Sequence, residues 1–368
     1  MLTEERRAEV QLESEIVEVA DVHEVVELFF ERRWTDGLPI VPPTEEKVVE
    51  MINYVGRDPQ EILGEIPPHN GIATIEKLAI NTVMAGCRPQ YFPVVIAAVE
   101  AILDPKHNLN GTQTTQSGVE QLLIVNGPVV KELAINYGDS VFGRGFRANG
   151  TIGRAVRLIL WNLGRNFPGD PDRSTHSHPG SWSFCIAEDE DASPWGPLHA
   201  EKGFPPESSA VTVFCCEAPH PALAHGTVNQ ILKSVCGAIA SPGSGNYLWL
   251  GGGSEILVTI SALNAEQFRR EGCSKRDVKE YIWEEARVSY GKIASTGMLS
   301  LPELGGSNFA DLLWPKWIDR TSPESLIPVT LSPDDIHVVV CGGQGSWCTV
   351  CHGWGYGGIA VTREVKTP

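Results

Sequence analysis

Several segments of the chain have apolar residues at every third or fourth position. That spacing lines one face of an α-helix. Residues 91–103 are apolar on nearly all sides, which predicts a helix buried in the core. Thr44 suits the N-cap of another helix, because its hydroxyl can accept a hydrogen bond from a free backbone N–H. The same pattern predicts helices over residues 23–33, 74–84, 150–164, 226–240, 264–271 and 275–287.

Short runs of aliphatic and β-branched residues lie between these helices and predict strands. Because strands and helices are interspersed, we expect an α/β or α+β fold, with a mixed sheet flanked by helices. No internal repeat of fixed period is visible in the sequence. The strands are predicted at residues 62–66, 122–125, 211–215, 256–260, 337–341 and 359–362.

Composition divides the chain into three parts. Residues 1–20 are rich in glutamate and are expected to form an arm that lies on the body or on a partner. Residues 21–326 are expected to form the main α/β body, in which 166–207 is a long irregular segment of a kind that often carries function. Residues 327–368 are expected to fold onto this body as a strand, a Cys-rich loop at 342–358, and a closing strand.

Charge and length exclude several classes of function. The 368 residues contain 29 Lys and Arg against 46 Asp and Glu, a net charge of −17, which disfavours nucleic acids and anionic membranes as partners. No apolar run approaches the roughly 20 residues of a membrane helix. The first residues do not resemble a secretory signal, so we expect a cytoplasmic protein. Nine cysteines are too sparse for a disulfide scaffold, so thiols gathered in a cluster are candidates for chemistry.

The sharpest candidate is a cluster of three cysteines and one histidine, Cys341, Cys348, Cys351 and His352, within twelve residues. Thiolate and imidazole are ligands of zinc, iron, cobalt and copper. A gap of two residues lets the sulfurs of Cys348 and Cys351 point at one centre if the segment is a loop. The glycines at 342 and 343 can adopt positive φ and let backbone amides approach sulfur. Gly342, Gly343, Trp347 and Trp354 are therefore candidate cofactor-binding residues, and the two tryptophans are expected to wall the site.

Four interpretations of this cluster remain open. Cys348 and Cys351 form a redox-active or nucleophilic pair, or they hold a catalytic metal. Cys-Thr-Val-Cys at 348–351 resembles the Cys-Thr-Leu-Cys metal-binding core of nitrile hydratase, although the next cysteine of that family is absent, since position 352 is His and position 353 is Gly. The third interpretation is a structural Cys3His zinc site, and the fourth is the attachment of a c-type haem at Cys-x-x-Cys-His.

Histidines and acids in the middle of the chain are further candidates. His178, Glu188 and His220 could transfer protons or line a pocket, and the alternative is an ordinary solvated loop. The glycines near 143–151 and 251–253 match neither the P-loop nor the dinucleotide-binding pattern, so no nucleotide is predicted.

Several segments resemble an uncharacterised bacterial family that accompanies or fuses with (seleno)proteins named for a U-G-S-C motif. The resemblance spans about residues 30–290, and it implies thiol or selenol chemistry, with a small redox subunit as a candidate partner. The sequence lacks Cys-Gly-Ser-Cys itself and has Gly-Ser-Trp-Cys at 345–348 instead. The resemblance rests on Thr-Asp-Gly-Leu-Pro-Ile-Val-Pro-Pro-Thr at 35–44, Ala-Ile-Asn at 79–81, Met-Ala-Gly-Cys-Arg-Pro at 84–89, Leu-Ile-Val-Asn-Gly-Pro at 123–128, His-Pro-Gly at 178–180 and Ser-Phe-Cys-Ile-Ala-Glu at 183–188.

Together these observations favour an oligomeric enzyme, an oxidoreductase or lyase, acting on a small organic molecule through a thiolate-rich site. Cys348, Cys351, His178, Glu188 and His220 are its candidate catalytic residues. One alternative is a lyase or hydratase that uses iron, cobalt, copper or zinc at the Cys-Thr-Val-Cys segment. The other is a non-catalytic scaffold subunit with a structural zinc.

Overall fold

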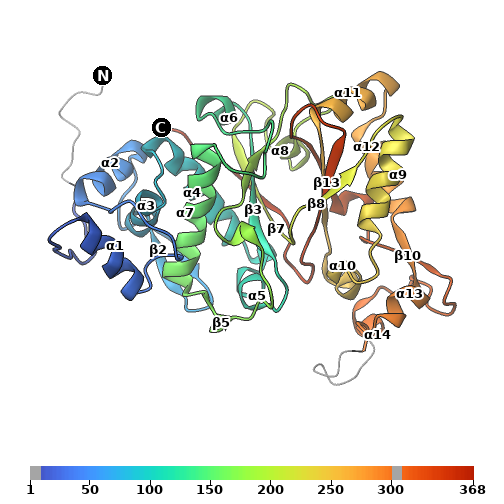
Figure 1. Ribbon diagram of the computed structural model, residues 1–368, viewed down its shortest axis with the longest axis horizontal. Coiled ribbons are helices and arrows are strands. Elements are labelled where there is room, and N and C mark those ends of the chain that lie inside the picture. The colour runs from blue at the N-terminus through green and yellow to red at the C-terminus, as the bar shows by residue number, and fades with distance from the viewer. Residues whose placement is uncertain (1–9, 301–308) are drawn as a thin grey trace.

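Two four-stranded sheets form the centre of the molecule, with helices on their outer sides (Figure 1). The computed structural model describes residues 10–300 and 309–368. The first sheet has the order β14 (Val361–Glu364), β7 (Ala210–Cys216), β3 (Glu120–Asn126) and β6 (Cys185–Ala187). The second has the order β12 (Ile336–Val340), β9 (Ile256–Ile260), β13 (Trp347–His352) and β8 (His220–Leu223). Strands and helices are mixed along the chain, which confirms the predicted fold class.

Helices cover the first sheet on the N-terminal side of the molecule. The predicted buried helix is α4 (Phe92–Ile102), in which every residue except Glu100 is buried. It packs on β7 and β14 and against α7 (Arg147–Gly164). The remaining elements of this half are α1 (Val22–Glu31), α2 (Glu45–Val55), β1 (Ile62–Ile66), β2 (Gly71–Thr74), α3 (Ile75–Met84), α5 (Leu109–Thr114), α6 (Val129–Glu132), β4 (Phe167–Pro168), β5 (Pro171–Asp172) and α8 (Leu198–Glu201).

The second sheet carries its own helices. The helix α9 (Val228–Ile239) begins with a capping box at Thr227 and packs on β13 and β8. It also contacts α12 (Lys275–Glu285), which follows α11 (Ala262–Glu271). The other elements here are α10 (Gly245–Leu248), β10 (Arg287–Ser289), α13 (Tyr290–Ser295), α14 (Phe309–Leu313) and β11 (Leu326–Pro328). In the described part of the chain, no helix is both long enough and apolar enough to span a bilayer.

The two sheets have the same topology, although the sequence shows no periodic repeat. In the first, β3 is parallel to β6 and antiparallel to β7. In the second, β9 is parallel to β12 and antiparallel to β13. A buried glutamate stands at the start of each central strand, Glu120 in β3 and Glu255 just before β9.

The outer strands of the two sheets are exchanged between the halves. β8 follows β7 in the chain but pairs with β13 of the second sheet. β14 follows β13 but pairs with β7 of the first sheet. The C-terminal segment 327–368 therefore supplies strands to both sheets, and the chain crosses twice between them.

Apolar side chains fill the layer between the sheets. Leu122, Phe214, Leu257 and Val339 meet there, each from a different strand, and all are fully buried. Neighbouring residues on these strands belong to the outer cores, because side chains alternate between the two faces of a strand.

Candidate functional site

The predicted cysteine cluster does not gather at one centre. The segment expected as a loop at 342–358 contains the strand β13, and this corrects the local prediction. Cys348 packs in the core beside α9, whereas Cys351 packs in the layer between the sheets. On a strand, the side chains of two residues that are three positions apart point to opposite faces of the sheet. The two sulfurs therefore cannot share a ligand as the loop interpretation supposed.

The other two predicted metal ligands, Cys341 and His352, also lie on different sides of the second sheet. Cys341 lies between the sheets with Cys351. The ring of His352 is buried, and its Nε2 donates to the carbonyl of Ile239 on α9 at 3.1 Å. Within residues 10–300 and 309–368, no group of three or more His, Cys, Asp or Glu is placed to hold a metal ion.

Two thiols of this cluster, those of Cys341 and Cys348, are poor nucleophiles in the folded state. Burial raises the pKa of Cys348 to about 11, against the opposing effect of a contact with Asn264 Nδ2 at 3.5 Å. Burial also raises the pKa of Cys341 far above its usual range. Thiols in such surroundings stay protonated near neutral pH.

The histidine-rich middle segment does meet the cysteine-rich tail. Nε2 of His178 donates to the carbonyl of Cys216 at 3.3 Å, while its Nδ1 accepts from the N–H of Gly180 at 3.1 Å. These two bonds define a neutral ring, and burial lowers the pKa of His178. The backbone of Cys216 in turn forms an isolated antiparallel β-bridge with Gly353, and its side chain lies beside Cys351.

The remaining predicted residues are dispersed. Glu188 is buried, where Oε2 accepts from Asn126 Nδ2 at 2.7 Å and from the N–H of Leu198 at 2.8 Å, and burial raises its pKa. His220 is exposed on β8. Trp347 is 51% exposed, whereas Trp354 is buried and donates to Thr115 Oγ1 at 3.1 Å, so the two rings do not wall one site.

The two predicted glycines each have a structural reason in the loop before β13. Gly342 has φ +96° and donates its N–H to the carbonyl of Tyr137 at 2.7 Å. At Gly343 a Cβ would lie 1.4 Å from Asp139 Oδ1, so the absent side chain allows a close approach of the chain. The N–H of Gly342 therefore donates to a carbonyl oxygen rather than to a cysteine sulfur.

A ligand-sized cavity lies elsewhere, between the N-terminal arm and α1, α2 and α3. Its volume is about 540 Å³, and its lining is mainly apolar. We call it the arm pocket. It was missed by the sequence reasoning, because its walls come from segments far apart in the chain. The apolar part of the wall is formed by Leu12, Ile16, Val17, Val19, Val25, Leu28, Phe29, Trp34, Pro42, Pro43, Val48, Ile80, Met84 and Leu163.

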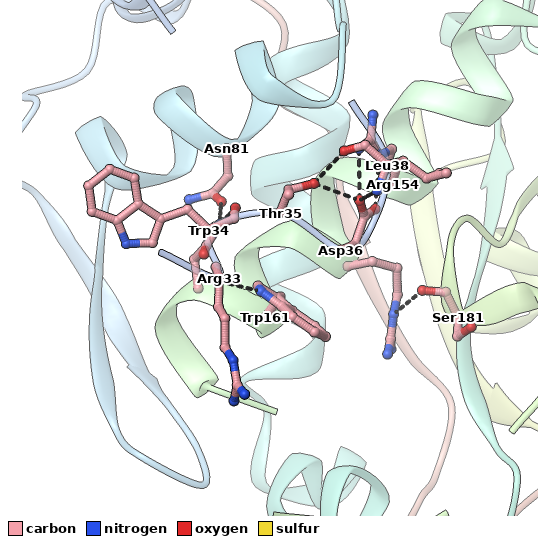
Figure 2. Close-up of polar contacts among 11 residues, drawn as sticks. Arg33, Trp34, Thr35, Asp36, Leu38, Asn81, Arg154, Trp161 and Ser181 are labelled. Atoms are coloured by element: carbon pink, nitrogen blue, oxygen red, sulfur yellow. Dashed lines mark hydrogen bonds and ion pairs between the residues drawn. The ribbon is translucent and has the colours of Figure 1, made fainter. Parts of the chain in front are cut away.

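One wall of the arm pocket is fixed by a network of polar contacts (Figure 2). Arg154 forms two bonds to the carboxylate of Asp36, with Nε 2.9 Å from Oδ2 and Nη2 2.8 Å from Oδ1. Trp161 Nε1 donates to the carbonyl of Arg33 at 2.7 Å. Asn162 Nδ2 donates both to the carbonyl of Trp34 at 3.0 Å and to Asn81 Oδ1 at 2.7 Å. The turn that carries Trp34 is therefore held rigidly on α7 and α3.

The opposite wall is the arm itself, anchored by one buried carboxylate. Glu76 on α3 accepts from the backbone N–H of Glu13 at 3.0 Å and of Ser14 at 2.7 Å. Gln60 Nε2 donates to the same carboxylate at 2.6 Å. These bonds lower the pKa of Glu76 against the opposing effect of burial. Residues 10–20 thus lie on the body, and residues 1–9 of the predicted arm lie outside the described residues.

Some residues of the arm pocket lie in segments that stand out in the sequence, although nothing in the sequence indicated a cavity there. Pro42, Pro43 and Thr44 belong to the segment 35–44, and Asn81 and Met84 belong to the segments 79–81 and 84–89. These segments are among those quoted for the predicted family resemblance, which stays a prediction. Comparison with known proteins gave no match, whether with family models, curated proteins or solved structures.

Proposed function

We propose that this protein binds a predominantly apolar small organic molecule in the arm pocket. The observation that carries the proposal is the cavity of about 540 Å³ with its apolar lining. Pockets for small molecules are concave, mainly apolar and about 300–1,000 Å³ in volume. A molecule of the size of a substituted bicyclic aromatic compound fits that volume.

The packing of α1 supports this proposal. None of the residues of α1 is fully buried, although Val25, Leu28 and Phe29 face the body. Protein interiors are close-packed, and side chains that face a void lose dispersion contacts. An apolar ligand beneath α1 would restore these contacts, and the few polar lining groups, among them Lys77 and Glu45, would orient it.

The substitution Ile80→Trp tests the arm pocket. N-phenyl-1-naphthylamine, an apolar probe that fluoresces in dry sites, is expected to bind the wild-type protein saturably. Ile80 lines the pocket, so the larger indole fills part of the cavity and should weaken probe binding at least tenfold, about 1.4 kcal/mol. A fluorescence titration measures the dissociation constant.

Ile72→Trp is the matched control, because Ile72 is 44% exposed and does not line the pocket. The control should bind the probe like the wild type. Absence of saturable binding to the wild type, or equal binding by both variants, would refute the proposal.

A second candidate function is a thiol redox reaction, and it rests on the neighbouring thiols of Cys216 and Cys351. Both are free and fully buried between the sheets, and burial and the contact with Cys351 raise the pKa of Cys216, so the reaction requires a transient opening of this layer. In a reducing cytoplasm, which we also propose as the location, the pair would stay reduced. Exchange with an external disulfide would join the two sulfurs and release two thiols, with two electrons passing to the external disulfide.

Oxidised glutathione tests this second candidate. The expected product is a peptide pair linked between Cys216 and Cys351, two hydrogens lighter than the reduced pair, found by mass spectrometry after digestion. Cys216→Ser should abolish the linkage, whereas Cys236→Ser, which removes a buried thiol of another core, should leave it intact. Recovery of the reduced pair alone after prolonged incubation would exclude the redox role.

A further inference from the structure

A second, much smaller cavity lies beneath β3, enclosed by α5, α7 and the segment 166–174. Its volume is about 10 Å³, which is the space that one water molecule or one small ion needs. In contrast to the arm pocket, its lining is almost entirely polar. We call it the polar cavity.

Two side-chain oxygens of the polar cavity have no hydrogen-bond partner. They are Gln113 Oε1 and Asn166 Oδ1, on residues that are 2% and 7% exposed. The orientation of Gln113 is fixed, because its Nε2 donates to the carbonyl of Pro67. A buried acceptor without a partner costs about 1–3 kcal/mol, so an occupant that satisfies both oxygens is favoured.

The charges around the polar cavity favour a cation as that occupant. Glu120 and Asp172 both line it. Glu120 is balanced by Arg157, with 2.7 Å between Oε2 and Nη1. Asp172 is half-buried and its Oδ1 accepts from the N–H of Ser174 at 2.8 Å, but it has no ion pair within residues 10–300 and 309–368. The lining thus offers amide and carboxylate oxygens with one uncompensated negative charge. Hard cations prefer oxygen ligands of this kind.

We propose that the polar cavity binds one monovalent cation the size of Na⁺. The ion would be held by Gln113 Oε1 and Asn166 Oδ1, with Asp172 supplying the balancing charge. These residues come from α5, the loop after α7, and β5, so the ion would tie three segments to the wall below β3. The site does not depend on a cluster of His, Cys, Asp and Glu, because two of its ligands are amide oxygens.

Thermal unfolding of the full chain tests this site. The Tm is measured while NaCl replaces tetramethylammonium chloride at constant ionic strength, which separates site binding from general screening. Binding to the folded state alone should raise the Tm by about 2 °C for each tenfold increase in Na⁺ above its dissociation constant. The same Tm in both salts would overturn the proposal and assign the cavity to water.

Two variants locate the response. Asp172→Asn removes the balancing charge with little change of shape, and Gln113→Leu removes a ligand oxygen; both should flatten the dependence of Tm on Na⁺. Glu132→Gln, which changes an exposed acid on α6, should keep the full response. If Gln113→Leu does not fold, the Tm response of Asp172→Asn to Na⁺ is sufficient to test the site. An undiminished response in Asp172→Asn would show that the ion binds elsewhere.

Discussion

Replacing Arg157 with methionine is expected to lower the free energy of unfolding by about 3–5 kcal/mol. Nη1 of Arg157 lies 2.7 Å from Glu120 Oε2 and also donates to Gln121, while Nε donates to the carbonyl of Ser181 at 3.1 Å. The two charged side chains are only 12% and 7% exposed. Burial already raises the pKa of Glu120 against the opposing effect of Arg157, so without the guanidinium the carboxyl group must either stay charged with only Ser177 Oγ, at 3.0 Å, as a donor or take up a proton, and both destabilise the fold. Urea denaturation followed by circular dichroism measures the change.

Arg57→Met provides the comparison for an exposed pair. Arg57 pairs with Glu61 and, at 3.2 Å, with Glu100, all three partly open to solvent, and such pairs contribute about 0–1 kcal/mol each. The double substitution Arg157→Met with Glu120→Leu should recover much of the lost stability, because no buried charge is then left alone. A loss for Arg157→Met no larger than for Arg57→Met would show that Glu120 does not depend on its partner.

Replacing Phe214 with alanine is expected to cost a similar amount, about 3–5 kcal/mol. Phe214 is fully buried on β7, in the layer between the sheets. Its ring meets the ring of His337 on the opposite sheet edge-on, with 5.7 Å between the centroids. Removal of the ring would leave a cavity between the sheets. Neither sheet can move in to fill it, because the strands of each sheet are fixed by their hydrogen bonds to one another. The same urea denaturation measures this loss.

Phe30→Ala serves as the control for Phe214→Ala. Phe30 lies on α1 and is 37% exposed, so its truncation should cost well under half as much. Equal losses for the two variants would mean that the sheets do not depend on the packing of the layer between them.

Elements with a strong local signal could be predicted from the sequence. The strand Ile256–Ile260 has the predicted bounds, because five consecutive strand-forming residues are flanked by polar ones. The helix α4 differs from its prediction by one residue at each end. In both β9 and α4, the order of apolar and polar residues within the segment is enough to predict the element.

The cysteine-rich tail shows where local signals fail. Glycines and small residues around 342–358 indicate a loop, yet Cys348–Val350 pair with both β9 and β8. Those partners lie about 90 and 130 residues earlier in the chain, so the pairing leaves no local trace. The prediction that Cys348 and Cys351 share one centre rested on this loop, because side chains three positions apart can converge on a loop but point to opposite faces of a strand.

The arm pocket was hidden from the sequence for a different reason. Its wall combines the arm, three helices and α7, and no single segment contains more than part of it. The turn at residues 33–38 looks like a simple helix stop in the sequence. Only the tertiary contacts of Arg154, Trp161 and Asn162 show that it forms a fixed wall.

The exchange of β8 and β14 has a consequence for how the chain can be made. A ribosome releases the N-terminal half first, but the first sheet lacks its outer strand until residues 361–364 have emerged. Until then β7 presents an unpaired edge, of the kind that invites association with other chains. The first sheet can therefore be completed only after nearly 150 further residues have been synthesised, and we expect its open edge to make the nascent chain prone to association during that time.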